Sequence, residues 1–252
     1  MRFGLSSLSL ALGMLLSAST AYAGTLYAVW GDSLYSANPT DGSWAVLSAT
    51  WNGTQLLAHH GGFLYAIQGD NLYKVNPADG TWQSLSSTWT GANALAGDCG
   101  ASLYASQNGS LYAVNPADGT WTVVPGSYAG TQFVACAGNA LMVIQNDTLY
   151  QVNPLDGSYT TLPSTYSGTT AVTGSPNFLY VVQGDTLYEV TPGTGTYRSV
   201  GGGYTGTTEM AFVDGALFSI SGDTLWRINT TDGSFVSLGT TWNGTTALSA
   251  VP

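Results

Sequence analysis

The 252-residue sequence has few charged residues, and basic residues are the scarcest of them. Lysine and arginine together number 4, against 14 aspartates and glutamates, which gives a formal net charge of −10. Nucleic acids and anionic membranes bind clusters of Lys and Arg, so neither is an expected partner. With 7% charged and 12% aromatic residues, the chain also differs from a coiled coil and from a solvated disordered chain.

Cysteine, histidine and the common catalytic motifs are also scarce. Two cysteines are too few for a disulfide-stapled miniprotein. The only histidines, His59 and His60, are neighbours without a second cluster of ligands, so we expect no metal and no cofactor. No nucleophile-elbow, zinc-protease or phosphate-loop pattern occurs. The sequence therefore favours a protein that binds over one that catalyses.

Residues 1–23 have the pattern of an export signal. Arg2 precedes an apolar run around residues 8–16, and Ala21-Tyr22-Ala23 is the small-x-small pattern that a signal peptidase accepts. We expect cleavage after Ala23, which leaves residues 24–252 as the mature chain. No later apolar run approaches 18 residues, so we expect no membrane insertion and a secreted, periplasmic or cell-surface location.

From Leu26 onward the sequence repeats six times. An Asn-Pro slot and an aromatic residue two positions before a glycine recur in step, every 38 or 39 residues. Two markers with the same spacing indicate a repeat architecture. The repeats span about residues 26–62, 63–100, 101–139, 140–177, 178–215 and 216–252.

Each repeat contains four short apolar runs separated by turn residues. In the second repeat the runs are 63–67, 71–75, 81–85 and 91–96, and none is long enough for an ordinary helix. The Gly-Asp and Asp-Gly pairs between runs suit tight hairpins, which predicts antiparallel pairing into a four-stranded sheet. Six such sheets predict an all-β, six-bladed β-propeller.

The run that follows the aromatic marker has small or modest side chains, as in residues 169–172 and 245–249, which suits a crowded central axis. We therefore expect this run to be the innermost strand of each blade. The mature chain starts with a second strand and ends with an innermost one. The C-terminal strand is thus expected to complete the first blade and close the ring.

Aromatic residues recur in four slots of the repeat. In the slots of Tyr27, Tyr35 and Trp44, the residue types Tyr, Trp, Phe and Met interchange, which predicts apolar packing between blades. The fourth slot, before the innermost strand, holds only Trp or Tyr and is followed by glycine and usually threonine. Such a ring could stack on a sugar, or it could cap the core between blades. The candidate ligand-binding residues are Trp51, Trp89, Tyr128, Tyr166, Tyr204, Trp242, Thr54, Thr131, Thr169, Thr207 and Thr245.

Ten of the fourteen acidic residues fall in the repeated Gly-Asp and Asp-Gly turns. Aspartate favours such turns because it tolerates a left-handed backbone and bonds its own main chain. Each turn offers one carboxylate, which is fewer than a calcium loop requires. Asp98, Glu189, Glu209 and Asp214 do not repeat, and no adjacent motif gives them a role.

Cys99 and Cys136 lie near the ends of the innermost strands of successive repeats. Export permits a disulfide, and adjacent blades would bring the two segments together. Their offsets from the preceding marker differ, 10 residues against 8. A disulfide and two small buried thiols therefore both remain open.

The repeats read Leu-Tyr-Ala-x-x-Gly-Asp-x-Leu-Tyr-x-Val-Asn-Pro-x-Asp-Gly-x-Trp, with a Trp-x-Gly-Thr segment after them. This pattern resembles the tectonin and tachylectin-type propellers over essentially all of residues 26–252. The resemblance implies a secreted or surface propeller, and several members of that group bind carbohydrate. We expect a monomeric, lectin-like protein with repeated weak sites for neutral surface glycans. The alternative is an extracellular scaffold or coat component that binds another protein without recognising sugar.

Overall fold

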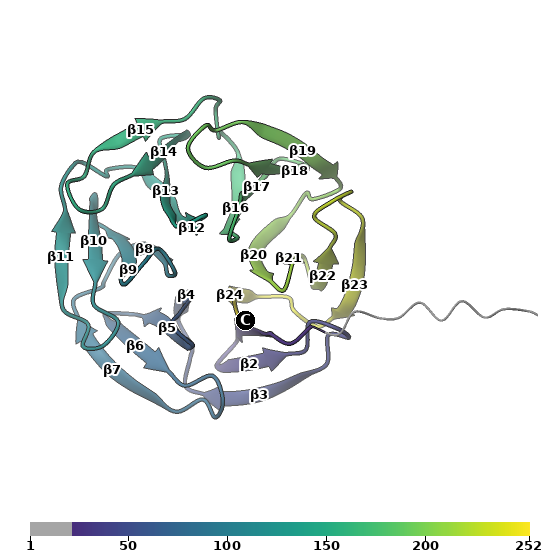
Figure 1. Cartoon of the computed structure of the whole chain (residues 1–252). Helices are drawn as coiled ribbons and strands as arrows, with labels where there is room; N and C mark the ends of the chain where they lie inside the picture. Colours follow the sequence, from purple (N-terminus) through teal and green to yellow (C-terminus); the bar gives the residue numbers. More distant parts are fainter. Residues whose placement is uncertain (1–21) are drawn as a thin grey trace, which may run out of the picture.

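The structure, a computed structural model, describes residues 22–252. Its 24 strands form six four-stranded antiparallel sheets arranged as blades around a central axis (Figure 1). The described residues contain no helix, and therefore none that could cross a membrane. The predicted six-bladed β-propeller is confirmed. The predicted export signal falls almost entirely outside the described residues.

The blades follow one another along the chain, and the strands of each blade run in order from the innermost to the outermost. Blade 1 consists of β24 (Thr245–Val251), β1 (Thr25–Trp30), β2 (Ser33–Ala37) and β3 (Trp44–Ala49). Blade 2 consists of β4 (Thr54–His60), β5 (Phe63–Gln68), β6 (Asn71–Val75) and β7 (Trp82–Ser87). Blade 3 consists of β8 (Ala92–Ala96), β9 (Leu103–Gln107), β10 (Ser110–Val114) and β11 (Trp121–Val124).

The other three blades have the same order. Blade 4 consists of β12 (Thr131–Ala137), β13 (Ala140–Gln145), β14 (Thr148–Val152) and β15 (Tyr159–Thr161). Blade 5 consists of β16 (Thr169–Gly174), β17 (Leu179–Gln183), β18 (Thr186–Val190) and β19 (Tyr197–Gly202). Blade 6 consists of β20 (Thr207–Val213), β21 (Ala216–Ser221), β22 (Thr224–Ile228) and β23 (Phe235–Thr240).

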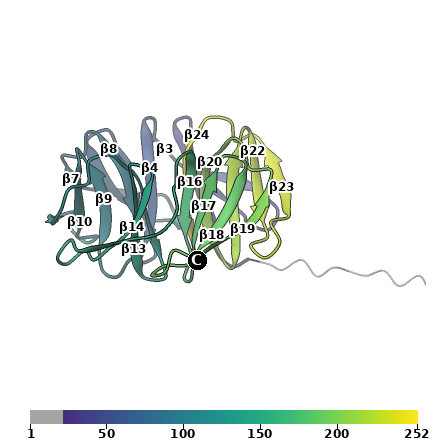
Figure 2. The same cartoon turned by 90° about the horizontal axis from the view of Figure 1, so that it is seen from above.

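The C-terminal strand closes the ring, as the order of the runs predicts. β24 pairs antiparallel with β1, with Leu26 opposite Ala250 and Ala28 opposite Leu248. Blade 1 thus joins the two ends of the propeller in one sheet, and the edge of β1 is paired. The side view shows the resulting short cylinder, with the C-terminal end of the chain at one face (Figure 2).

The Asp-Gly turn between the third and fourth strands is fixed by its own side chains. In blade 2, Asp79 Oδ1 accepts hydrogen bonds from Thr81 Oγ1 (2.7 Å) and from the Thr81 backbone N–H (2.9 Å). Asn76 Oδ1 accepts a bond from the Ala78 N–H (3.1 Å). These bonds favour the carboxylate and hold the pKa of Asp79 below its usual range. The pattern explains the repeated turn acids without a ligand.

The turn glycine also packs against the preceding blade. Gly80 has φ +72°, and a Cβ placed there would lie 2.8 Å from the carbonyl oxygen of Leu47 and 2.9 Å from its Cγ, on the outer strand of blade 1. Only a residue without a side chain permits this approach. The corresponding glycines of the other blades make the same kind of contact: Gly42, Gly119, Gly157, Gly195 and Gly233.

Replacing Gly80 with alanine should therefore cost more than replacing another glycine of the same blade. Gly69 also has a positive φ (+57°), but no atom lies within 4 Å of a Cβ placed there. Gly69→Ala should cost about 1–2 kcal/mol for the backbone conformation. Gly80→Ala adds overpacking and should cost roughly 3–5 kcal/mol. Urea unfolding of both variants measures the difference, and equal losses would contradict this role of the turn glycine.

Candidate functional site

The fourth-slot rings, the residues predicted to stack on sugars, are buried between blades. Their relative exposures are between 1% and 5%: Trp51 2%, Trp89 1%, Tyr128 5%, Tyr166 4%, Tyr204 3% and Trp242 2%. None offers an open face to a sugar. The interpretation of these six rings as stacking platforms is therefore wrong, and the alternative, that they cap the core between blades, describes their position.

Hydrogen bonds hold the loops that carry these rings. The Trp51 N–H donates to the Asp32 carbonyl in the Gly-Asp hairpin of the preceding blade (2.9 Å). The Trp51 indole Nε1 donates to Ser48 Oγ at 2.9 Å, and Trp89 Nε1 donates to Ser86 Oγ at 3.0 Å. The loop is thus held from both sides, and the ring fills the space between two sheets.

The threonines beside these rings either bond the main chain of the turn or are buried. Thr131 Oγ1 donates to the Tyr128 carbonyl at 2.7 Å, and Thr169 and Thr245 repeat this bond. Thr54 and Thr207 are almost completely buried, at 0% and 1% exposure. These five hydroxyls belong to the turn into the innermost strand and are poorly placed for a sugar.

The third slot, which the sequence suggested would pack between blades, is the exposed one. We call its six residues the outer aromatic belt: Trp44 46%, Trp82 51%, Trp121 45%, Tyr159 67%, Tyr197 56% and Phe235 42% exposed. Each is the first residue of the outermost strand of its blade. The prediction of buried packing is wrong for this slot because no strand or blade lies outside the outermost strands (Figure 1).

Each ring of the outer aromatic belt is held by a second-slot ring of the same blade. The pairs are T-shaped, with centroid distances from 5.0 Å for Tyr112 and Trp121 to 5.7 Å for Tyr188 and Tyr197. In blade 2 the contacts continue inward, because Tyr73 also packs edge-on against the buried Trp51 at 5.8 Å. An exposed ring with such support keeps one orientation at low entropic cost.

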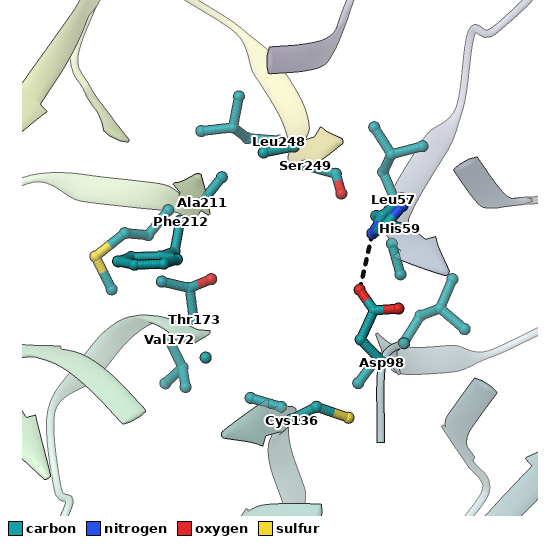
Figure 3. A pocket seen from close by; sticks show the side chains of 18 of the residues that line it. Leu57, His59, Asp98, Cys136, Val172, Thr173, Ala211, Phe212, Leu248 and Ser249 are labelled. Atoms are coloured by element: carbon teal, nitrogen blue, oxygen red, sulfur yellow. Dashed lines mark hydrogen bonds and ion pairs between the residues drawn. The ribbon is translucent and has the colours of Figure 1, made fainter. Parts of the chain in front are cut away.

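The innermost strands enclose a central channel of about 850 Å³. Figure 3 shows side chains from several blades pointing into it, among them Leu57, Val172 and Leu248. His59 and Asp98 lie together on one side, and Ser249 lies on a neighbouring strand. The channel therefore combines an apolar lining with a few polar groups, which makes it the second candidate site.

Both ring nitrogens of His59, which lines the channel, have hydrogen-bond partners. His59 Nδ1 lies 2.8 Å from Asp98 Oδ2, and His59 Nε2 accepts a bond from the Gly62 N–H at 3.1 Å. Nδ1 therefore carries the proton and donates it to the carboxylate. His60 Nδ1 accepts a bond from the Asp98 N–H at 3.1 Å. Neither nitrogen of His59 is available as a general base for Ser249.

Burial affects two further titratable groups of this region, Glu209 and His60, in opposite ways. The pKa of Glu209 is raised to about 8 by desolvation, which a bond from the Leu248 backbone only partly offsets. The pKa of His60 is lowered, mainly by burial. Both groups are therefore predominantly neutral at pH 7. No three His, Cys, Asp or Glu side chains in residues 22–252 are arranged to hold a metal ion.

Cys99 and Cys136 form a disulfide between blades 3 and 4 beside the channel, with their Cα atoms 5.2 Å apart. This was one of the two alternatives left open by the sequence. Cys99 lies just after β8, whereas Cys136 lies within β12. The turn after β8 therefore accounts for the two-residue difference in their distances from the preceding aromatic marker.

The acids that do not repeat have specific positions that sequence reasoning missed. Asp98 joins blade 3 to the histidines of blade 2, and Asp214 joins blade 6 to Gly24. Glu189 binds both Arg198 Nε (2.7 Å) and Arg198 Nη2 (2.9 Å). Their departure from the repeat is the one signal in the sequence that could have identified them.

No protein-family model and no curated protein matches the sequence. The function is therefore inferred from the fold and from the geometry of the outer aromatic belt and the channel.

Glu209 should make the protein less stable as the pH rises. Between pH 4.5 and 8 the folded chain keeps the proton that the unfolded chain has lost, so the free energy of unfolding falls across this window. Glu209→Gln should remove that fall and gain on the order of 3 kcal/mol relative to the parent at pH 8. Thermal unfolding of the parent and the variant from pH 6.5 to 8.5 measures it, and the contribution of His60, which is present in both chains, cancels in their difference. Asp79→Asn, the same change at an exposed turn, should keep the parental pH dependence; a parental slope in Glu209→Gln would contradict the prediction.

Proposed function

We propose that the protein is an exported binding scaffold that recognises neutral surface carbohydrate through the outer aromatic belt. The exposure of one ring in every blade carries this proposal. A sugar ring presents a face of C–H groups that stacks on an aromatic face, and a ring already fixed by a T-shaped neighbour loses little entropy when it does so.

The groups around the belt suit an uncharged ligand. Exposed hydroxyl and amide side chains follow the rings on the same strands, such as Gln83 and Ser84 after Trp82 and Thr122 after Trp121. These can donate to and accept from sugar hydroxyls. The net charge of −10 disfavours acidic sugars, because they would be repelled.

The sixfold repetition of the site favours a dense target. A single stacked ring with a few hydrogen bonds binds weakly. Six sites on one rigid ring engage a surface that presents many copies of the sugar, and binding is strengthened by effective concentration. The short leader at residues 1–23 would bring the protein to such surfaces.

Retention on immobilised neutral polysaccharides tests this function. The triple variant Trp44→Ala, Trp82→Ala, Trp121→Ala should lower retention at least about tenfold, because it removes three of the stacking faces. Its circular dichroism should stay close to that of the parent, because these rings are half exposed.

The matched control replaces three exposed aliphatic residues of outermost strands, Val46→Ala, Val123→Ala and Val236→Ala, and should retain parental binding. Val46 and Val123 lie on the strands of Trp44 and Trp121, and Val236 follows Phe235 on β23. Retention of glycans by the folded tryptophan variant, or no binding of the parent to any neutral glycan on an array, would overturn the proposal.

A second candidate is a scaffold that binds another extracellular protein. The exposed side chains of Val46, Val123, Val236 and Leu155 (90% exposed) favour it, because aliphatic groups beside aromatic ones are typical of protein interfaces. Capture of one specific protein, lost in the valine variant and unaffected by free sugars, would support this candidate over the first.

A further inference from the structure

Gly24 lies at the seam where the ring closes. It directly precedes β1 of blade 1, and its backbone nitrogen donates a 2.7 Å hydrogen bond to Asp214 Oδ2. Asp214 lies in the turn between β20 and β21 of blade 6, 190 residues away. This contact therefore joins the first and last blades at the ring-closing seam.

The seam admits only glycine at this position. A Cβ on Gly24 would collide with Val213 Cγ2 and lie 2.8 Å from the Val251 carbonyl oxygen. Gly24 is buried, whereas the preceding residue, Ala23, is exposed. The peptide bond between the exposed Ala23 and the buried Gly24 is the bond that the small-x-small pattern marks for cleavage.

We propose that removal of the leader creates a latch, in which the new N-terminal ammonium of Gly24 forms an ion pair with Asp214 and fastens blade 1 to blade 6. A signal peptidase adds water across the Ala23–Gly24 bond. The leader leaves with the Ala23 carboxylate, and the Gly24 amine takes up a proton at neutral pH. This proposal rests on export, which is part of the proposed function, but it is independent of carbohydrate binding.

Cleavage strengthens a contact that the uncleaved chain already makes. The peptide N–H of Gly24 is a neutral donor, whereas an ammonium brings a positive charge and two more donors to the same carboxylate. The bond in the uncleaved chain already has an ionised acceptor, and the ammonium adds to it the Coulomb attraction of an ion pair. Asp214 is one of the few acids outside the repeated Gly-Asp and Asp-Gly turns. It lies in the turn between β20 and β21, and its side-chain oxygen accepts the bond from Gly24 across the seam.

The charges near Tyr22 disfavour an earlier start. A cut after Ala21 would place the ammonium on Tyr22, whose nitrogen faces the Thr40 hydroxyl at 3.3 Å and whose ring lies 5.5 Å from the Arg227 guanidinium. The ammonium would then face a hydroxyl, on a residue whose ring already lies against a positive charge. When the leader is removed after Ala23, the Tyr22 ring leaves Phe218, and Arg227 keeps its 3.1 Å bond to the Thr40 carbonyl.

Two chains that differ by one residue test the latch. Fusions cut by a protease that leaves no extra residue give proteins that start at Gly24 or at Ala23, and each is made with Asp214 and with Asp214→Asn. The Gly24 start should raise the midpoint of thermal unfolding by roughly 2–4 °C, and Asp214→Asn should abolish this difference. Asp223→Asn, an acid of the same blade with the same change in charge, should preserve it.

The full chain, expressed with its leader and recovered after export, should have the intact mass of residues 24–252. If Asp214→Asn does not fold, acetylation of the Gly24 start gives the same comparison, since it removes the charge and should remove the gain. An exported chain that begins elsewhere, or a gain that survives Asp214→Asn or acetylation, would overturn the latch. Glycan retention is measured separately, so either result leaves the proposed function to be judged by its own test.

Discussion

The propeller depends on the contact between the glycine in the turn after each third strand and the outer edge of the blade before it. A blade is a small sheet with two apolar faces, and it cannot be stable alone. At Gly80 the absence of a side chain allows the turn to lie against Leu47 of the preceding blade, while the buried Trp51 fills the gap between the same two sheets. This contact between neighbouring blades, which we call the inter-blade joint, occurs six times and bends the row of blades into a ring. β24 pairs with the last free edge.

The same joint decides which aromatic rings face solvent. Trp51 is held inward because its N–H bonds the Asp32 carbonyl and its indole bonds Ser48. Trp82 begins an outermost strand, so its ring rests on Tyr73 and on the edge of Trp51 and leaves part of its surface open. Burial of one ring and exposure of the other are thus two results of one arrangement.

This explains why the sequence predicted the fold better than the site. Strand number, pairing and closure follow from local signals, such as the Asp-Gly hairpins and the 38-residue spacing. Exposure depends on the neighbouring blade, which no single repeat describes. Trp occurs in both the third and the fourth slot, so residue type alone could not separate the buried Trp89 from the exposed Trp121. The pairing of Cys99 with Cys136 likewise depended on the course of one turn.

The channel and the belt differ in how far their side chains leave hydrogen-bonding atoms or ring faces free for a ligand. In the channel, both nitrogens of His59 have partners and Glu209 holds its proton, so neither presents a charge or a vacant nitrogen to a ligand. In the belt, a ring such as Trp121 is supported on one side by Tyr112 and left open on the other. Recognition requires a group that is held in one position and still has a free hydrogen-bonding atom or an open face. Among the described residues the belt meets both conditions once in every blade, and this is the physical reason for placing the binding surface on the circumference of the ring.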